Sequence, residues 1–111
     1  MCSANHDGFG ASLNSLPWNQ LAPGLRDKVY ETRQRRFRIL EFSEPFAEPD
    51  WCIKGHAGYV LEGEIVVNVA GRSVTFRAGD VIDLPAGTRH KHDRTVQAAT
   101  LFLVEDQTES T

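Results

Sequence analysis

Residues 79–90 read GDVIDLPAGTRH, an apolar run with a turn signal at each end. The letters GD precede the run at residues 79–80, and PAG follow it at residues 85–87. Gly and Pro provide the backbone angles that tight turns require. This stretch therefore predicts a short strand between two reversals, the second of which leads directly to His90.

Short segments with alternating apolar residues lie on both sides of this stretch. The alternating positions are Phe37 and Ile39; Ile65, Val67 and Val69; and Val74 and Phe76. Because residues two apart share one face of a strand, each segment predicts a half-buried strand, and residues 96–104 supply a last one. No window shows the spacing of an amphipathic helix. The sequence therefore predicts an all-β protein, an antiparallel barrel or sandwich.

The length of the chain allows one domain. It has 111 residues, and single domains commonly contain about 100–150. Residues 1–20 are rich in Ser, Asn, Gly and Ala without a sustained period, so we expect an N-terminal arm or flexible tail there. The barrel domain is expected over residues 21–105, and the polar residues 106–111 are expected to form a C-terminal tail.

The charge of the chain argues against several classes of partner. Twelve Lys and Arg against fifteen Asp and Glu give a formal net charge of -3, which offers no general attraction for nucleic acid or anionic lipid. The basic cluster Arg33, Arg35, Arg36 and Arg38 is interpreted as a solvated hairpin and edge strand. No apolar run reaches the roughly 18 residues of a membrane span, and no signal peptide is evident, so we expect a cytoplasmic location.

Five residues that can bind a metal gather in the middle of the strand region. They are Asp50, Cys52, His56, His90 and His92. On an extended segment Asp50, Cys52 and His56 would point the same way, and so would His90 and His92 after their turn. Thiolate, imidazole and carboxylate groups that converge in a concave site are what a transition metal requires.

The turn and the histidine after it resemble the second signature motif of the cupins, a family of small antiparallel barrels. In that motif Gly is followed after five residues by Pro, after one more by Gly, after two more by His and after three more by Asn. The matching residues are Gly79, Pro85, Gly87 and His90, each at the expected spacing. Arg94 stands where Asn is usual.

The first cupin motif is matched in spacing and altered in chemistry. It runs through two histidines separated by one residue, then a Glu, then six residues and a Gly. Gly63 resembles that final glycine, which places His56 at the position of the Glu. Cys52 then stands at the second His position and Asp50 at the first.

This resemblance implies a cupin barrel with one divalent metal in its mouth. Cys52, His56 and His90 are the expected ligands, and Asp50 or His92 would complete the shell. A thiolate with two imidazoles suits zinc. If Cys52 does not bind, then Asp50, His56 and His90 form a two-His, one-carboxylate set that suits iron, and nickel or manganese would also be possible.

The fold that the resemblance implies selects no reaction, because cupins include enzymes, binding proteins and storage proteins. We expect a metal-dependent enzyme that acts on a small polar, anionic metabolite, with His92 as the candidate residue that moves protons. The alternative is a non-catalytic module that binds or senses a metal or a small ligand, which four protein ligands around the metal would favour. Exposed strand faces and the arm at residues 13–23 would suit a homodimer.

Overall fold

The computed structural model describes residues 9–44, 46, 52, 55–93 and 97–106. Across these ranges the chain forms strands and one short 3-10 turn, Leu13–Ser15 (η1), and no α-helix. The strands are β1 (Asn19–Ala22), β2 (Leu25–Glu31), β3 (Arg35–Phe42), β4 (His56–Glu62), β5 (Glu64–Val69), β6 (Arg72–Arg77), β7 (Val81–Leu84), β8 (His90–His92) and β9 (Ala99–Asp106). The predicted all-β class is confirmed.

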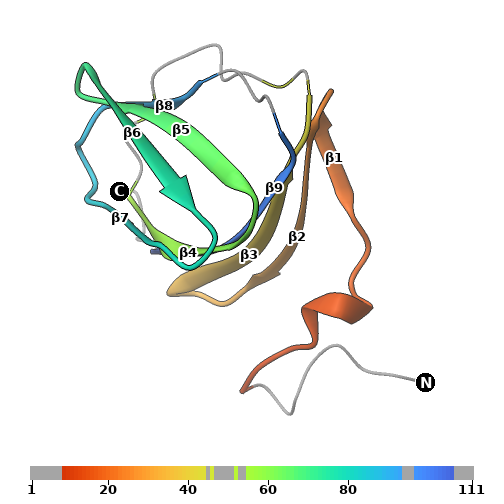
Figure 1. The fold of residues 1–111 in the computed structure, drawn as a ribbon. Helices are drawn as coiled ribbons and strands as arrows, with labels where there is room; N and C mark the ends of the chain where they lie inside the picture. Colours follow the sequence, from red (N-terminus) through yellow and green to blue (C-terminus); the bar gives the residue numbers. More distant parts are fainter. Residues whose placement is uncertain (1–8, 45, 47–51, 53–54, 94–96, 107–111) are drawn as a thin grey trace.

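The strands form two sheets whose pairings are all antiparallel. One sheet has the order β1-β2-β3-β9-β4-β7, and the other has the order β6-β5-β8. Figure 1 shows the two sheets curling around a common interior, with β5, β6 and β8 on one side and β3 and β9 on the other. This arrangement is a jelly-roll barrel, which confirms the antiparallel barrel that the sequence predicted.

The turns at residues 79–80 and 85–87 position one strand and lead to another. Gly79 and Gly87 take positive φ values of 96° and 92°, a conformation that costs glycine little. Between the two turns, β7 pairs with β4 at the edge of the larger sheet. After the second turn, β8 begins at His90 and pairs with β5 in the smaller sheet. The chain therefore crosses from one sheet to the other within a few residues.

Apolar side chains from both sheets fill the interior. The buried core residues are Leu40, Phe42, Val60, Ile65, Val67, Ile82, Leu84, Ala99, Leu101 and Leu103. In β9 burial alternates strictly along the strand, as expected when one face of a sheet packs against another. In β3 the core residues are Leu40 and Phe42, whereas the alternating Phe37 and Ile39 are half-buried on the other face.

The segment before the barrel adds to the larger sheet. β1 begins at Asn19, and its pairing with β2 places Asn19 opposite Asp27. The guanidinium of Arg26 lies 3.9 Å from the centre of the Trp18 ring, a cation–π contact that fixes the approach to β1. In the part of the chain that the structure describes, no helix is long and apolar enough to cross a membrane.

Candidate metal centre

Cys52 and His90 face each other through two backbone hydrogen bonds. The amide of Cys52 donates to the carbonyl of His90 at 2.8 Å, and the amide of His90 donates to the carbonyl of Cys52 at 2.9 Å. Residues paired in this way present their side chains on the same face, with Cβ atoms about 5 Å apart. The backbone alone therefore brings a thiol next to an imidazole.

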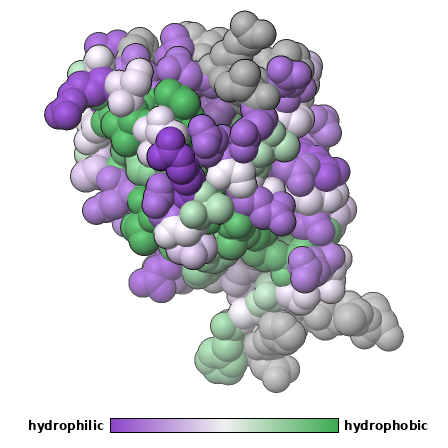
Figure 2. All heavy atoms as spheres, in the orientation of Figure 1, coloured by the Kyte–Doolittle hydropathy of each residue, from purple (hydrophilic) through white to green (hydrophobic). Residues whose placement is uncertain are grey.

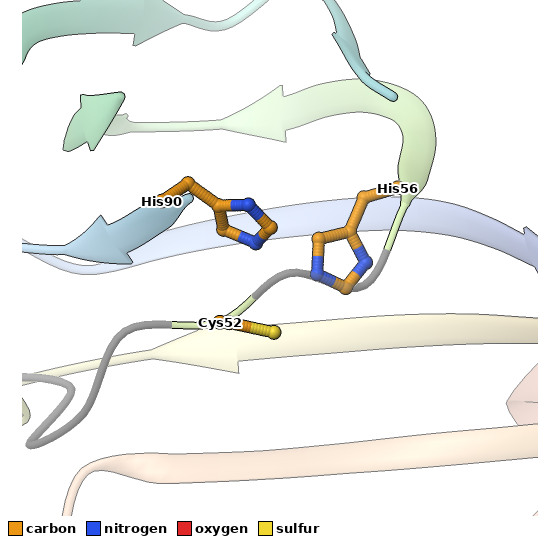
Figure 3. A group of neighbouring side chains, drawn as sticks. All are labelled: Cys52, His56 and His90. Atoms are coloured by element: carbon orange, nitrogen blue, oxygen red, sulfur yellow. The ribbon is translucent and has the colours of Figure 1, made fainter. Parts of the chain in front are cut away.

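His56 completes a group of three from the first residue of β4. The ligand atoms of Cys52, His56 and His90 all lie within 4.8 Å of one another. Figure 3 shows the three side chains converging on a shared space from three different segments of the chain. Zinc holds its nitrogen and sulfur ligands at about 2.0–2.3 Å, so the space between these atoms suits one ion.

The ring of His90 is oriented by its own strand. Its Nδ1 lies 3.1 Å from the carbonyl oxygen of Thr88, and because a carbonyl only accepts, Nδ1 carries the proton. Its Nε2 is then left with a lone pair, buried and without a hydrogen-bond partner among the described residues. A buried acceptor of this kind is costly unless something binds it. A metal ion beside Cys52 and His56 would satisfy it.

The ring of His56 is held by Glu105. Its Nδ1 lies 2.7 Å from Glu105 Oε2, a short contact in which the N–H is not aimed straight at the oxygen. The register of β4 and β9 pairs Ala57 with Val104, so the next residues, His56 and Glu105, meet across the two strands. Since a carboxylate only accepts, the contact favours a proton on Nδ1 and leaves Nε2 available as a ligand.

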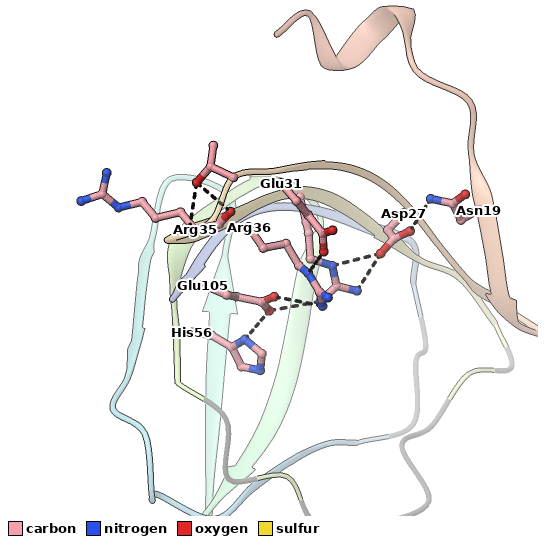
Figure 4. A network of polar contacts seen from close by, with 9 residues as sticks. Asn19, Asp27, Glu31, Arg35, Arg36, His56 and Glu105 are labelled. Carbon is pink, nitrogen blue, oxygen red and sulfur yellow. Dashed lines mark hydrogen bonds and ion pairs between the residues drawn. The ribbon is translucent and has the colours of Figure 1, made fainter. Parts of the chain in front are cut away.

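A buried ion network lies behind His56. Glu105 Oε2 lies 3.1 Å from Arg38 Nη1, and Arg38 Nη2 lies 2.9 Å from Asp27 Oδ2. Asn19 donates to Asp27 at 3.1 Å (Figure 4). The network therefore runs from the metal group, which is Cys52, His56 and His90, to β1. Burial on its own would raise the pKa of Glu105, but the contact with His56 and the charge of Arg38 outweigh it and lower that pKa. Glu105 is therefore ionised near neutral pH.

A cavity opens beside these polar groups, between the two sheets. Its volume is about 210 Å³. Cys52, His56 and His90 line it together with Arg38 and Glu105, and the remaining wall is mostly apolar core. Cys52, His56 and His90 thus lie beside a partly open cavity into which a small molecule could fit.

Residues 53–104 match the family model for the cupin domain. The chain is a cupin-domain protein. His56 and His90 lie inside the matched segment of the cupin domain, and Cys52 immediately precedes it. No curated protein matches the chain significantly.

Solved structures of other proteins superimpose on this one, one of them described as a cupin. An RmlC-like cupin from Shewanella frigidimarina NCIMB 400 is 20% identical with a TM-score of 0.76, over 99% of this chain and 97% of that one. KdgF from Halomonas sp. is 17% identical with a TM-score of 0.73, over 87% and 91%. The polyketide cyclase RemF from Streptomyces resistomycificus is 16% identical with a TM-score of 0.73, over 91% and 80%. At these identities the likeness shows the cupin fold alone.

The cupin fold brings together three of the five ligands that the sequence predicted. Cys52, His56 and His90 form one group, whereas His92 is not part of it. Asp50 lies outside the described residues, as does Arg94 of the second motif. The structure therefore describes three protein donors, and a tetrahedral site would have one further position.

His92 forms part of the cavity wall of this cupin. It shares the inward face of β8 with His90, and its ring stacks on Phe42 with 4.1 Å between centres and 9° between planes. Phe46 lies against it as well, at 5.7 Å. Burial lowers the pKa of His92 to about 4, against a smaller opposite effect of Asp93. At neutral pH this ring is uncharged.

Two residues of the cupin site were missed in the sequence. Glu105 is the last residue of the predicted barrel and has no predicted role in the site, although it continues the inward series of Leu101 and Leu103 at a spacing of two. Arg38 was assigned to a solvated edge strand, but β3 lies between β2 and β9, and the Arg38 side chain is 14% exposed. The alternation in β9 was the signal that could have found Glu105. Arg38 stands two residues before the core residue Leu40, so the alternation in β3 likewise places it on the inward face.

Proposed function

We propose that this cupin binds one divalent transition metal through Cys52, His56 and His90 and acts through that metal on a small molecule. The observation that carries the proposal is the buried Nε2 of His90, which has no hydrogen-bond partner among the described residues and lies in the group with Cys52 and His56. Protein interiors rarely leave such an acceptor unsatisfied. An ion between the three side chains accounts for it.

Zinc is the metal that this donor set favours. A thiolate and two imidazoles are borderline-soft ligands, which suit zinc better than the harder ions that prefer carboxylates. A thiolate ligand is also unfavourable beside iron that activates oxygen, because the sulfur can itself be oxidised. If Cys52 does not bind, then Asp50, His56 and His90 would instead suit iron, nickel or manganese.

The residues around the metal centre would have separate roles in an enzyme. When bound, the metal would supply a Lewis acid beside the cavity, at the position that the three described donors leave free. Glu105 keeps the His56 ring in one orientation, and the carbonyl of Thr88 does the same for His90. The apolar wall excludes water from the ligand. His92 stays the predicted proton carrier, and its low pKa makes it a weak base.

A non-catalytic binding or sensing module is the second candidate. It would be favoured if a fourth protein ligand closed the site, because a structural zinc site leaves no position for substrate. Asp50, two residues before Cys52, is the sequence-based candidate for that ligand. The cavity beside the metal group favours the enzyme, since a purely structural site has no need of an adjoining space.

We also propose that the cupin pairs as a homodimer through the outer face of its larger sheet. Tyr59, Leu61 and Val81 are 44%, 43% and 68% exposed there, and Tyr59 pairs with Phe102 and Val81 on the neighbouring strands. Figure 2 shows hydrophobic residues at the surface between hydrophilic ones. Light scattering should give the mass of two chains for the wild type and of one chain for Leu61→Glu. A monomeric wild type would contradict this.

Cobalt substitution tests the metal proposal, because a cobalt–thiolate bond gives a charge-transfer absorption that imidazole ligands do not give. We expect this band on adding cobalt to the metal-free wild type, and its loss in Cys52→Ala. Cys2→Ala is the matched control and should retain the band. A band that persists in Cys52→Ala, or its absence from the wild type, would overturn the proposed ligand set.

A further inference from the structure

We infer that the cavity receives a ligand with a compact apolar body and a single anionic head group, and that it discriminates against polyhydroxylated molecules. The head group would lie at the metal, so the inference rests on the function proposed above. It narrows the expected polar, anionic metabolite to one whose polarity is confined to one end.

The wall of the cavity is the first observation. Of the sixteen described residues that line it, ten are aliphatic or aromatic. They come from both sheets and include Leu40, Phe42, Ile65, Val67, Leu101 and Leu103. A surface of this kind gains binding free energy by covering apolar atoms and offers nothing to a hydroxyl group.

The polar lining residues are already engaged, which is the second observation. Cys52, His56 and His90 form the metal group, while Arg38 and Glu105 pair with each other. The ring of His92 stacks on Phe42 and has a tilted contact with Phe46. Among the described lining residues there is no Ser, Thr, Asn, Gln or Tyr to pair with a sugar hydroxyl. Each hydroxyl buried here would lose its hydrogen bonds to water without replacement.

The size of the cavity limits the body of the ligand. An apolar cavity of about 150 Å³ is known to hold a benzene molecule. At about 210 Å³, this cavity has room for a ring of that size and a short arm. The arm would carry the head group toward Cys52, His56 and His90, which converge at one part of the wall.

The charge of the centre determines the head group. Two neutral imidazoles and one thiolate leave a divalent ion with one net positive charge. Arg38 is contacted by two carboxylates, Asp27 and Glu105, so its charge is not available to a ligand. The direct partner of a head group is therefore the divalent ion, and an anionic oxygen is the ligand that such an ion attracts most strongly at a position its protein donors leave free. A carboxylate supplies it.

Calorimetry on the full zinc-loaded chain tests this with three probes. Phenylacetate has the ring and the carboxylate, phenylacetamide has the ring without the charge, and ribonate has the carboxylate on a hydroxylated body. We expect phenylacetate to bind at least about ten-fold more tightly than either of the others. Ribonate or phenylacetamide binding as tightly as phenylacetate would overturn the inference, and so would the failure of all three to bind.

The zinc content of the same samples separates the two proposals. One zinc per chain with no preference for phenylacetate refutes this inference and leaves the metal site standing. A chain that takes up no zinc refutes the proposed function, and with it the inference. Phenylacetate should bind at least about ten-fold more weakly to the metal-free chain, because its carboxylate then lacks a partner.

A variant pair tests whether the cavity is the binding site. Ile65→Phe enlarges a wall residue, and we expect it to lose phenylacetate binding while keeping zinc. Val66→Phe is the matched control, because Val66 stands next on β5 and faces the other way. Unchanged phenylacetate binding in Ile65→Phe would contradict the placement. If Ile65→Phe does not fold, the comparison of the three probes on the wild type still tests the inferred class of ligand.

Discussion

Glu105 Oε2 lies 2.7 Å from His56 Nδ1 and 3.1 Å from Arg38 Nη1, so one carboxylate oxygen contacts both a metal-ligand candidate and a buried cation. The position of Glu105 is set by β9, which runs between β3 and β4 and carries it to both neighbours. A carboxylate that contacts the second nitrogen of a metal-binding imidazole fixes the orientation of that ring and strengthens its bond to the metal. The centre therefore depends on more than its three donors.

Glu105→Gln should weaken zinc binding by about ten- to a hundred-fold, because it removes the charge that holds His56 while keeping the size of the side chain. Competition with a chromophoric chelator would measure the zinc affinity. Glu31→Gln is the matched control, since Glu31 is 46% exposed and pairs with Arg36, which itself lies 3.9 Å from Glu105. Equal affinities for wild type and Glu105→Gln would refute the positioning role.

Arg38→Met should lower the free energy of unfolding by about 3–5 kcal/mol, because it leaves Asp27 and Glu105 buried without their cation. Urea denaturation would measure the change. Arg77→Met provides the comparison, since Arg77 and its partner Glu64 are 66% and 40% exposed. That exposed pair should contribute less than about 1 kcal/mol. Similar losses of unfolding free energy in the two variants would show that burial of the network does not determine its contribution to stability.

The stability of the metal-free protein should fall as the pH decreases from 6.5 to about 4. Burial lowers the pKa of His92 from 6.5 to about 4, so in this window the unfolded chain binds a proton that the folded chain does not. His92→Phe keeps a ring on Phe42 and removes this effect. Relative to that variant, the wild type should lose about 3 kcal/mol across the window.

Urea titrations in chelator at several pH values would measure this difference. Well above pH 6.5 the stability difference between wild type and His92→Phe should not depend on pH, because His92 is uncharged there in both the folded and the unfolded chain. A difference that stays constant from pH 7 to pH 4 would mean that His92 titrates normally in the folded protein.

Most of the fold could be predicted from the spacing of turn residues and alternating apolar residues in the sequence. Gly79 and Gly87 could be identified because a tight reversal needs positive φ, and the strand between them follows from the apolar run. The group of Cys52, His56 and His90 follows from the spacings of two cupin motifs, which this sequence keeps although the residue types at three ligand positions differ. Alternation and turn chemistry are local, and a single sequence displays them.

The buried ion network could not be read in the same way. Arg38 and Glu105 are charged residues near the end of an arginine cluster and near a polar terminus, where charge normally marks solvent. They are buried because β3 and β9 become neighbours in the middle of a six-stranded sheet, which brings opposite charges together. That pairing joins positions 67 residues apart, and no local pattern contains it.

Metal analysis of the full chain, purified without added metal or a metal-affinity resin, tests the central claim most directly. The account predicts about one zinc per chain in the wild type and its loss in both Cys52→Ala and His90→Ala, because each removes one of three donors. Cys2→Ala should keep the zinc. A wild type without metal, or metal retained after Cys52→Ala, would contradict the claim that these side chains form a thiolate metal centre.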